Sequence, residues 1–199
     1  NNDPATMINQ LFEFIVQNDS CTARLQALIR AKHFLYTINI KEQVNTISEE
    51  TYQNIMSALV QLLEKCNLDG TEIQYVFLII SSFMKNFIIP GYWPQIFDIM
   101  LQFVESPFCS YAIKFFSDYF SYVNPESNQI PEGLISKVPE LIKFDSPDPN
   151  VIISSISLSF QLVKFPDFRS LLESIPQAIF NLPDMQINPA IDLFDGFYQ

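Results

Sequence analysis

The single histidine of the chain, His33, is the residue that general acid–base catalysis would most readily use. It stands between Lys32 and Phe34. A histidine base needs a carboxylate that orients it or a nucleophile that it activates, and the sequence places neither at a recognisable spacing. We therefore expect His33 to be a packed or surface residue, and we expect that the chain is not an enzyme.

The sequence also contains no recognisable motif for binding a metal or a cofactor. Cys21, Cys66 and Cys109 are each more than 40 residues from the next, whereas metal sites use clustered cysteine, histidine or carboxylate ligands. The four glycines are scattered and form no loop that would hold a phosphate group. We expect no metal and no cofactor. Three widely spaced cysteines also make a disulfide framework improbable, which favours a reducing compartment.

The amino-acid composition indicates which kinds of binding partner to expect. The 199 residues are 48% apolar and 17% charged, and 22 acidic against 11 basic residues give a net charge of -11. Nucleic-acid binding needs clustered Lys and Arg, so we expect no nucleic acid among the partners. The longest apolar run, from Tyr75 to Met84, is far shorter than the ~20 residues that cross a bilayer. We expect no membrane insertion, and partners that are proteins.

The sequence predicts helices along the whole chain. Apolar residues recur at helical spacing in nearly every stretch, and no run alternates as a strand would. Proline and glycine punctuate the breaks, and Asp148 followed by Pro149 predicts a helix N-cap with proline at the first helical position. The expected helices are about 4–17, 20–38, 48–66, 72–88, 92–105, 108–123, 131–144, 149–164, 167–181 and 186–198.

Two internal offsets indicate a repeat. Ser106-Pro107 and Ser146-Pro147 are 40 residues apart, and each closes one expected helix and opens the next. A second match aligns "ISKVPELI" with "LESIPQAI" and places Pro139 on Pro176. Such periods are typical of a repeated helical hairpin of roughly 40 residues. Proline inside a helix costs ~3 kcal/mol unless the helix bends, so two equivalent prolines suggest bent outer helices.

The expected helix 108–123 has an unusually broad apolar face. Apart from a narrow strip of Ser, Lys and Asp, its residues cover roughly 200° of arc, well beyond the ~100° of a surface helix. A helix of this kind must contact its hairpin partner and the hairpins on both sides, which is the position of an inner helix in a stacked solenoid. A compact globule of ten helices is the alternative, and the repeat offsets favour the solenoid.

The stretch "GLISKVPELIKFDSPDPNVIISSISLSF" resembles a HEAT repeat, which has an internal proline in its first helix and Asp in the turn. The match runs through Leu134, Val138, Pro139, Leu141, Ile142, Asp145 and Val151. Ile152 stands where the family often has Arg, so this stretch does not predict the Arg–Asp ladder of many HEAT proteins.

The stretch "KNFIIPGYWPQIFDIMLQFVESP" resembles a repeat of the importin-β (karyopherin-β) nuclear transport receptors. Trp93 and Pro94 carry most of the likeness, followed by an apolar helix that closes at Ser106-Pro107. The resemblance implies inner helices that contact a Ran-type GTPase and cargo, and shallow pockets between outer helices that take Phe-Gly repeats of nucleoporins. It also implies a location in cytoplasm and nucleus.

The expected partner-binding surface is the polar strip on each second helix of a hairpin. Tyr92 and Phe97 are the expected lining of an apolar groove on the outer helices. The strip consists of Gln74, Ser81 and Lys85, then Ser110, Lys114, Ser117 and Asp118, then Ser154, Ser157 and Gln161.

The sequence thus predicts an all-α, right-handed α-solenoid of about five HEAT- or armadillo-like hairpins, in a single segment of a longer chain. Protein recognition within an importin-β-like receptor is the expected function. A non-transport scaffold or adaptor, in a phosphatase, trafficking or cytoskeletal assembly, is the alternative. The expected hairpins are about 1–39, 48–88, 92–123, 131–164 and 167–199.

Overall fold

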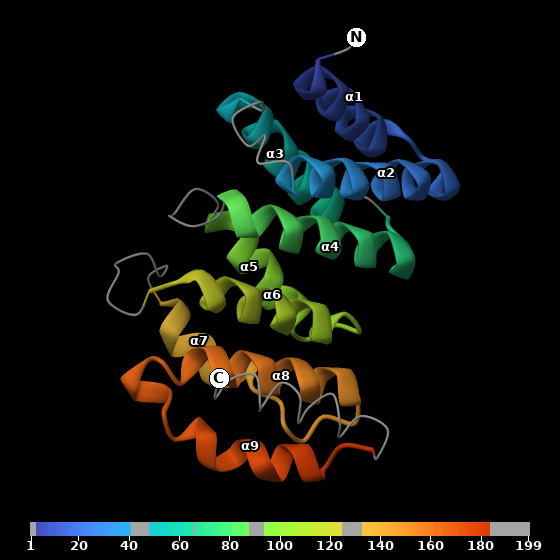
Figure 1. The fold of residues 1–199 in the computed structure, drawn as a ribbon. Helices are drawn as coiled ribbons and strands as arrows, with labels where there is room; N and C mark the ends of the chain where they lie inside the picture. Colours follow the sequence, from blue (N-terminus) through green and yellow to red (C-terminus); the bar gives the residue numbers. More distant parts are fainter. Residues whose placement is uncertain (1–2, 41–47, 66, 88–93, 125–132, 184–199) are drawn as a thin grey trace. The chain divides into compact units, whose positions relative to one another are not determined.

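The computed structural model describes residues 3–40, 48–65, 67–87, 94–124 and 133–183. Across these ranges the chain is all-α and has no β-strand, as the sequence predicts (Figure 1). The elements are α1 (Pro4–Gln17), α2 (Cys21–Ile40), α3 (Glu49–Lys65), α4 (Gly70–Phe87), α5 (Pro94–Phe103), α6 (Cys109–Tyr122), α7 (Leu134–Leu141), α8 (Pro149–Leu162), the short 3₁₀ helix η2 (Pro166–Phe168) and α9 (Leu171–Phe180).

Helix starts follow local capping. The Asp3 carboxylate accepts a hydrogen bond from the Thr6 N–H at 3.2 Å, and Pro4 opens α1. At α8, the Asp148 carboxylate accepts from the Asn150 N–H at 2.9 Å, with Pro149 at the first helical position. This confirms the N-cap predicted there, because proline lacks the N–H that a first turn leaves unpaired.

Two of the predicted helices are shorter in the structure. The expected helix 131–144 is observed over α7, which ends at Leu141. The backbone N–H of Lys143 donates to the Ser155 hydroxyl of α8 at 3.0 Å, so the chain leaves the helical path there. The expected helix 167–181 is observed as η2 followed by α9. The expected helix 186–198 lies outside the described residues.

The prolines predicted inside helices are there. Pro139 is the sixth residue of α7 and Pro176 the sixth of α9, and both are exposed. Each removes one backbone hydrogen bond from its helix. Their equivalent placement agrees with the offset by which the two sequences align.

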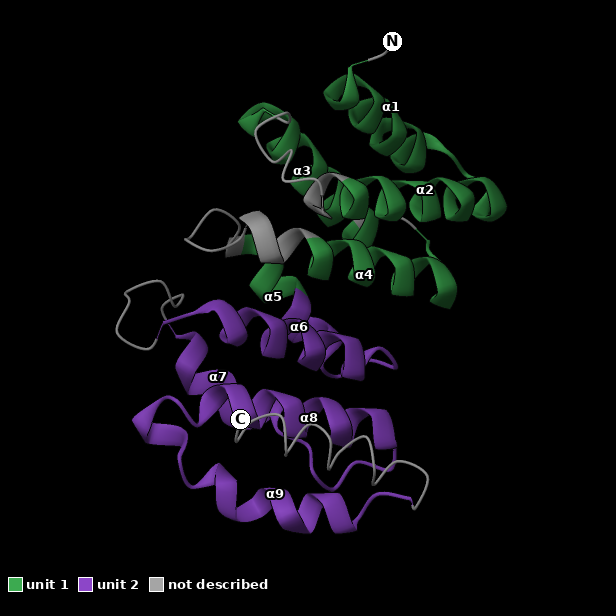
Figure 2. Ribbon diagram, viewed as in Figure 1, with its two compact units in different colours: residues 1–88, 92–99 green, residues 89–91, 100–199 purple. Residues whose placement is uncertain are grey.

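The chain forms two compact units (Figure 2). Unit 1 comprises residues 1–88 and 92–99, and unit 2 comprises residues 89–91 and 100–199. In unit 1, α1 packs against α2 and α3, α2 packs along α4, and α3 contacts α4. Its core contains Phe12, Leu28, Leu59 and Phe77, each at most 2% exposed.

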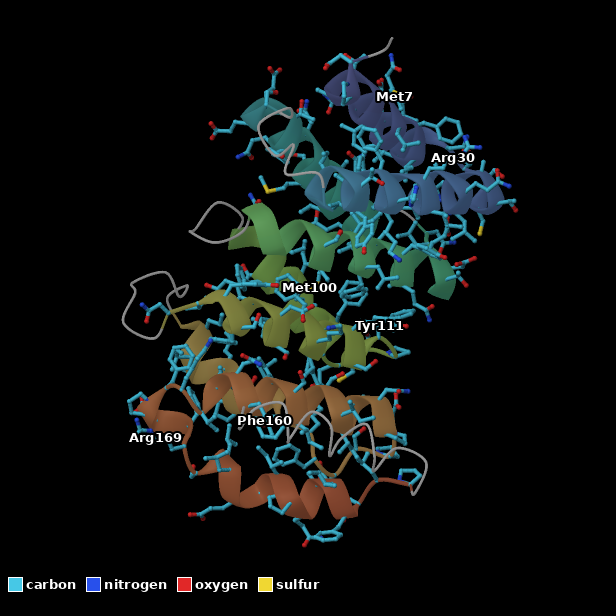
Figure 3. The ribbon with its side chains drawn as sticks, viewed as in Figure 1. Met7, Arg30, Met100, Tyr111, Phe160 and Arg169 are labelled. Atoms are coloured by element: carbon cyan, nitrogen blue, oxygen red, sulfur yellow. The ribbon has the colours of Figure 1, made fainter. Side chains whose placement is uncertain are left out.

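In unit 2, α6 packs along α8, and α8 packs against α9. The layer between α8 and α9 is built from Ile152, Ile156, Phe160, Ile175 and Ala178, and Figure 3 shows the Phe160 side chain in this layer.

Helix α6 is buried over most of its circumference. Phe115 and Phe116 are neighbours in sequence and both are fully buried, and Phe120 is fully buried one turn later. A helix that faced one partner only would leave one of two successive positions exposed. The broad burial expected of this helix from its sequence is therefore observed.

No helix in the described ranges is both long enough and apolar enough to span a membrane.

Candidate interaction surface

A polar network joins the starts of α2 and α4 in unit 1. The Arg24 guanidinium donates from Nε to Glu72 Oε1 at 2.7 Å and from Nη2 to Glu72 Oε2 at 3.0 Å. Arg24 also donates to the carbonyl oxygens of Asn18 at 2.9 Å and Asn67 at 3.2 Å. The Glu72 side chain is fully buried and that of Arg24 is 9% exposed. A two-pronged, charge-assisted pair of this kind fixes two helices in register.

Asp69 and Glu72 cap each other at the start of α4. The Glu72 N–H donates to Asp69 Oδ1 at 2.8 Å, and the Asp69 N–H donates to Glu72 Oε2 at 2.9 Å. This reciprocal arrangement is a capping box with Asp at the N-cap. It satisfies two backbone donors and also holds the Glu72 carboxylate where Arg24 reaches it.

The Cys21 thiol at the start of α2 joins the same network. Its sulfur donates to Asp69 Oδ2 at 2.8 Å. This hydrogen bond, with burial and the charge of Glu72 acting in the same direction, raises the pKa of Cys21 to about 11. The bond from Cys21 lowers the pKa of Asp69 below its ordinary value. Cys21 is therefore a protonated, weakly nucleophilic thiol at neutral pH.

Cys21, Asp69 and Glu72 bring three potential metal ligands within 4.8 Å of one another, a grouping that the sequence spacing did not suggest. Both oxygens of Glu72 already accept hydrogen bonds from Arg24. The thiol proton occupies the facing oxygen of Asp69. Because these carboxylate oxygens already accept hydrogen bonds, the cluster serves as a structural link, here called the polar clasp, between α2 and α4.

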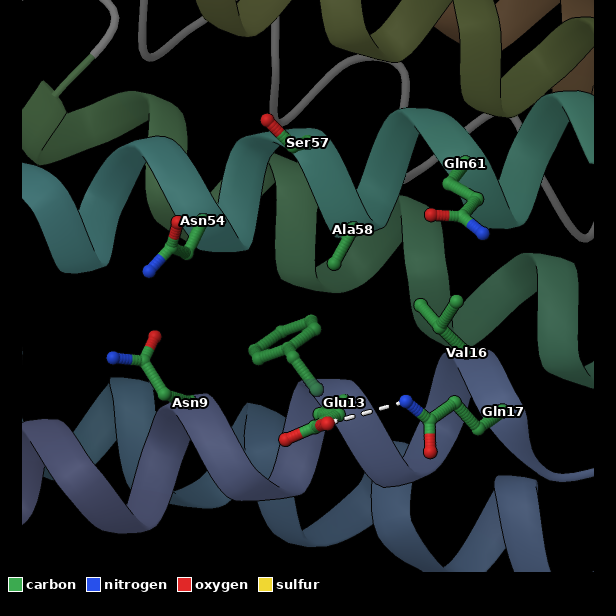
Figure 4. Close-up of a pocket in the computed structure, with 9 residues that line it drawn as sticks. Asn9, Glu13, Val16, Gln17, Asn54, Ser57, Ala58 and Gln61 are labelled. Carbon is green, nitrogen blue, oxygen red and sulfur yellow. Dashed lines mark hydrogen bonds between the residues drawn. The ribbon is translucent and has the colours of Figure 1, made fainter.

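A groove of about 420 Å³ lies between α1 and α3, also within unit 1 (Figure 4). Phe12, Val16 and Ala58 form its apolar floor. Asn9 and Gln17 line the groove from α1, and Asn54, Ser57 and Gln61 line it from α3. Among the described lining residues, Glu13 is the one that carries a charge. The groove is therefore mostly neutral and rich in carboxamide groups.

A second hollow, of about 490 Å³, lies in unit 2 between the turn that precedes α6 and the turn that precedes α8. The two Ser-Pro turns found by sequence offset both line it. The Lys143 ammonium crosses it and donates to the Val104 carbonyl at 3.2 Å and to the Glu105 carboxylate at 2.6 Å. Burial is the main cause that raises the pKa of Cys109, which also lines the hollow.

The predicted polar strips lie partly on the surface and partly between helices. On α4, Gln74 is exposed and Ser81 is half-buried, while the Lys85 side chain lies outside the described part of the chain. Ser110 and Asp118 on α6 and Ser154, Ser157 and Gln161 on α8 are half-buried. Lys114 is exposed and forms an ion pair with Asp118 at 3.0 Å.

Ser117 is placed differently from the expectation. It is 3% exposed, and its hydroxyl shares a hydrogen bond of 2.8 Å with the Ser157 hydroxyl. The two serines occupy equivalent positions on α6 and α8, which pack against each other. Ser117 therefore joins two helices and cannot serve as an open partner contact.

Phe97 corrects a second expectation. It is 6% exposed, and its neighbours Ile96, Ile99 and Met100 are buried as well. The exposed face of α5 consists of Gln95, Asp98 and Gln102. These residues are three and four positions apart, so they mark one face of the helix and leave Phe97 on another. Tyr92, the other expected groove residue, lies outside the described residues.

His33 is exposed on α2, in agreement with the expectation that it is a packed or surface residue. Its backbone carbonyl accepts a hydrogen bond from the Thr37 hydroxyl at 2.9 Å.

The polar clasp was missed by sequence reasoning because its members are 48 residues apart, outside the offsets of 37 and 40 that the repeats suggested. The signal that could have found it is the pattern Asp69-x-x-Glu72 before an apolar run, which is a capping box. No protein-family model, curated protein or solved structure matches the chain.

Proposed function

We propose that the chain is a right-handed α-solenoid of HEAT-like hairpins that recognises proteins as part of an importin-β-like nucleocytoplasmic transport receptor. The observation that carries this proposal is the recurrence of long-range hydrogen bonds at separations of 39 to 48 residues. In unit 1, Arg24 bonds Glu72 48 residues away, and in unit 2 Ser117 bonds Ser157 40 residues away and Lys143 bonds Val104 39 residues away.

This separation is about one helical hairpin. Bonds of this length therefore join equivalent positions of successive hairpins, as expected in a linear repeat array. The packing of α2 along α4 and of α6 along α8 supports the same interpretation, because each pair consists of the second helices of neighbouring hairpins.

The Arg24–Glu72 pair also supports a HEAT-like arrangement. The resemblance implies charged ladders between repeats, and the stretch around Ile152 does not carry one. Arg24 provides such a link near the other end of the chain, where it bridges two second helices. The ladder is then local to one pair of hairpins.

Transport is the finer part of the proposal, and the α5 region supports it. Helix α5 begins at Pro94 of the Trp-Pro pair and ends at Phe103, where the Ser106 hydroxyl donates to the Phe103 carbonyl at 2.7 Å. The helix thus lies within the segment that resembles the receptor repeat. The mechanism would be docking of several weak contacts along the second helices, with no bond chemistry, in cytoplasm and nucleus.

The test is binding of the full chain to a Ran-type GTPase loaded with GTP, compared with the GDP-loaded form, and to a Phe-Gly peptide, compared with a Ser-Gly peptide. Lys114→Ala on α6 should weaken the GTPase complex, because Lys114 is an exposed cation on the proposed surface. Lys137→Ala is the matched control, since Lys137 is exposed on the first helix of its hairpin. Binding to neither probe would remove the transport proposal and leave the non-transport scaffold.

A further inference from the structure

We propose that the groove between α1 and α3 binds an extended segment of a partner protein through that segment's main chain. The segment would carry an apolar residue beside a Lys or Arg. This site is independent of the second-helix surface proposed above, since it lies on the first helices of two successive hairpins.

The lining residues are spaced to follow an extended chain. Asn9, Glu13 and Gln17 are four residues apart on α1, which separates them by about 6 Å along the helix axis. Alternate residues of an extended peptide are about 6.6 Å apart. The spacing of these three side chains therefore matches that of alternate peptide residues over the roughly 12 Å between Asn9 and Gln17.

The carboxamides face each other across the groove. Figure 4 shows Asn9 opposite Asn54 at one end and Gln17 opposite Gln61 at the other. Each carboxamide offers both a donor and an acceptor, which is what a main chain needs, because every residue of an extended peptide other than proline presents one N–H and one C=O. A helical ligand has its main-chain N–H and C=O groups paired internally, so it would form no main-chain hydrogen bonds with the carboxamides.

One acceptor in the groove has no donor. The Asn9 side-chain oxygen is buried and accepts no hydrogen bond from a described residue. The Asn9 amide nitrogen donates to the Thr51 hydroxyl at 3.4 Å. Rotation of the Asn9 side chain would bring its oxygen to the groove, where a peptide N–H would supply the missing donor.

The charge of Glu13 and the apolar floor of the groove indicate which side chains the bound segment should carry. Side chains of an extended peptide alternate between two faces, so one face meets the apolar floor, where Val16 and Ala58 are half-buried and accessible. Glu13 is exposed at the rim and favours a Lys or Arg on the segment. Its present bond is one hydrogen bond of 3.2 Å from the Gln17 amide, which a cation can replace.

The probe is a fluorescein-labelled, end-capped peptide, Thr-Leu-Lys-Val-Thr, titrated with the full chain in a fluorescence anisotropy assay. Asn54→Ala with Gln61→Ala should weaken binding by about tenfold, the loss expected for two hydrogen bonds. Gln53→Ala is the matched control, because Gln53 is an exposed amide next to Asn54 that does not line the groove. Both substituted side chains are exposed, so the fold should be retained.

Two further measurements alter the peptide. A peptide with N-methyl groups on Leu and Val lacks two main-chain donors and should bind about tenfold more weakly. Replacing its Lys by Glu should also weaken binding, and Glu13→Gln should remove the difference between the Lys and Glu peptides.

Any of three results would overturn the proposal. The unmodified peptide fails to bind, the methylated peptide binds equally well, or the double variant binds like Gln53→Ala. A Phe-Gly peptide that binds more tightly than the probe, and loses affinity in the same double variant, would assign the groove to Phe-Gly repeats instead. Failure here leaves the GTPase test on α6 unaffected.

Discussion

Arg24 and Glu72 form a two-pronged ion pair although 48 residues separate them, with N–O distances of 2.7 and 3.0 Å. Glu72 is held from one side by the capping box with Asp69 and from the other by Arg24. One carboxylate thereby caps the start of α4 and also binds this helix to α2.

Glu72→Gln should lower the free energy of unfolding by about 3–5 kcal/mol, because it leaves the Arg24 guanidinium buried without a counter-charge. The double variant Arg24→Met with Glu72→Met removes both charges together and should cost less than Glu72→Gln, although it also loses the capping bond of Glu72. Urea titration followed by circular dichroism measures both. The exposed Lys114–Asp118 pair is the control, and Lys114→Ala should cost under ~1 kcal/mol. A cost for Glu72→Gln as small as that of Lys114→Ala would contradict the assigned role.

Alkylation of Cys21 should have an unusually alkaline pH dependence. The pKa of Cys21 is raised from 9.0 to about 11, first by its hydrogen bond to Asp69. Because the folded-state pKa exceeds the ordinary value, the stabilisation from this bond is complete below pH 9 and is lost as the pH rises toward 11. Iodoacetamide labelling followed by mass spectrometry should therefore remain slow at pH 9. Asp69→Asn should move the midpoint of labelling back toward the ordinary value, and an unchanged midpoint would rule out Asp69 as the cause.

Phe116→Ala should lower the free energy of unfolding by ~3–5 kcal/mol, as for a large aromatic side chain removed from a closed core. Phe116 is fully buried and lies edge-to-face with Phe115 at a centroid distance of 5.2 Å. Phe180→Ala is the matched control, because Phe180 is 79% exposed on α9 and should change stability by no more than ~0.5 kcal/mol. Equal effects of the two substitutions in a thermal melt would show that α6 is not a core helix.

Pro139→Ala and Pro176→Ala should each stabilise the protein. Alanine restores the missing backbone hydrogen bond and avoids a helix cost of ~3 kcal/mol, while the unfolded chain gains ~1 kcal/mol of freedom. A net gain of about 1–2 kcal/mol is expected. Pro149→Ala is the control, since Pro149 occupies the first position of α8, where proline is favourable. A loss of stability in both helices would mean that the backbone geometry set by these prolines is needed for packing.

Local rules explain what the sequence predicted well. The start of α8 at Asp148-Pro149, the start of α1 at Pro4 and the two internal prolines depend on residues within one turn of each other. Capping and proline geometry act over that range, so one sequence is enough to predict them.

The contacts across hairpins were less predictable. Ser117 and Ser157 were predicted to be polar positions on second helices, but the approach of α6 to α8 turns them toward each other. Phe97 was assigned to the solvent side although Gln95 and Asp98 mark another face of α5 as exposed. Cys21 meets Asp69 only because α2 packs along α4. Such pairings depend on helix rotation and separation, which one sequence does not determine.

The order of packing within each unit has a mechanical consequence. In unit 1 the principal partners of each helix are the next helix or the next but one, and in unit 2 α8 contacts both α6 and α9. In unit 1, α1 contacts α2 and α3, and both of these contact α4. Tension applied at α1 and α4 would therefore be shared between two paths, and the unit should resist a pull until both paths give way.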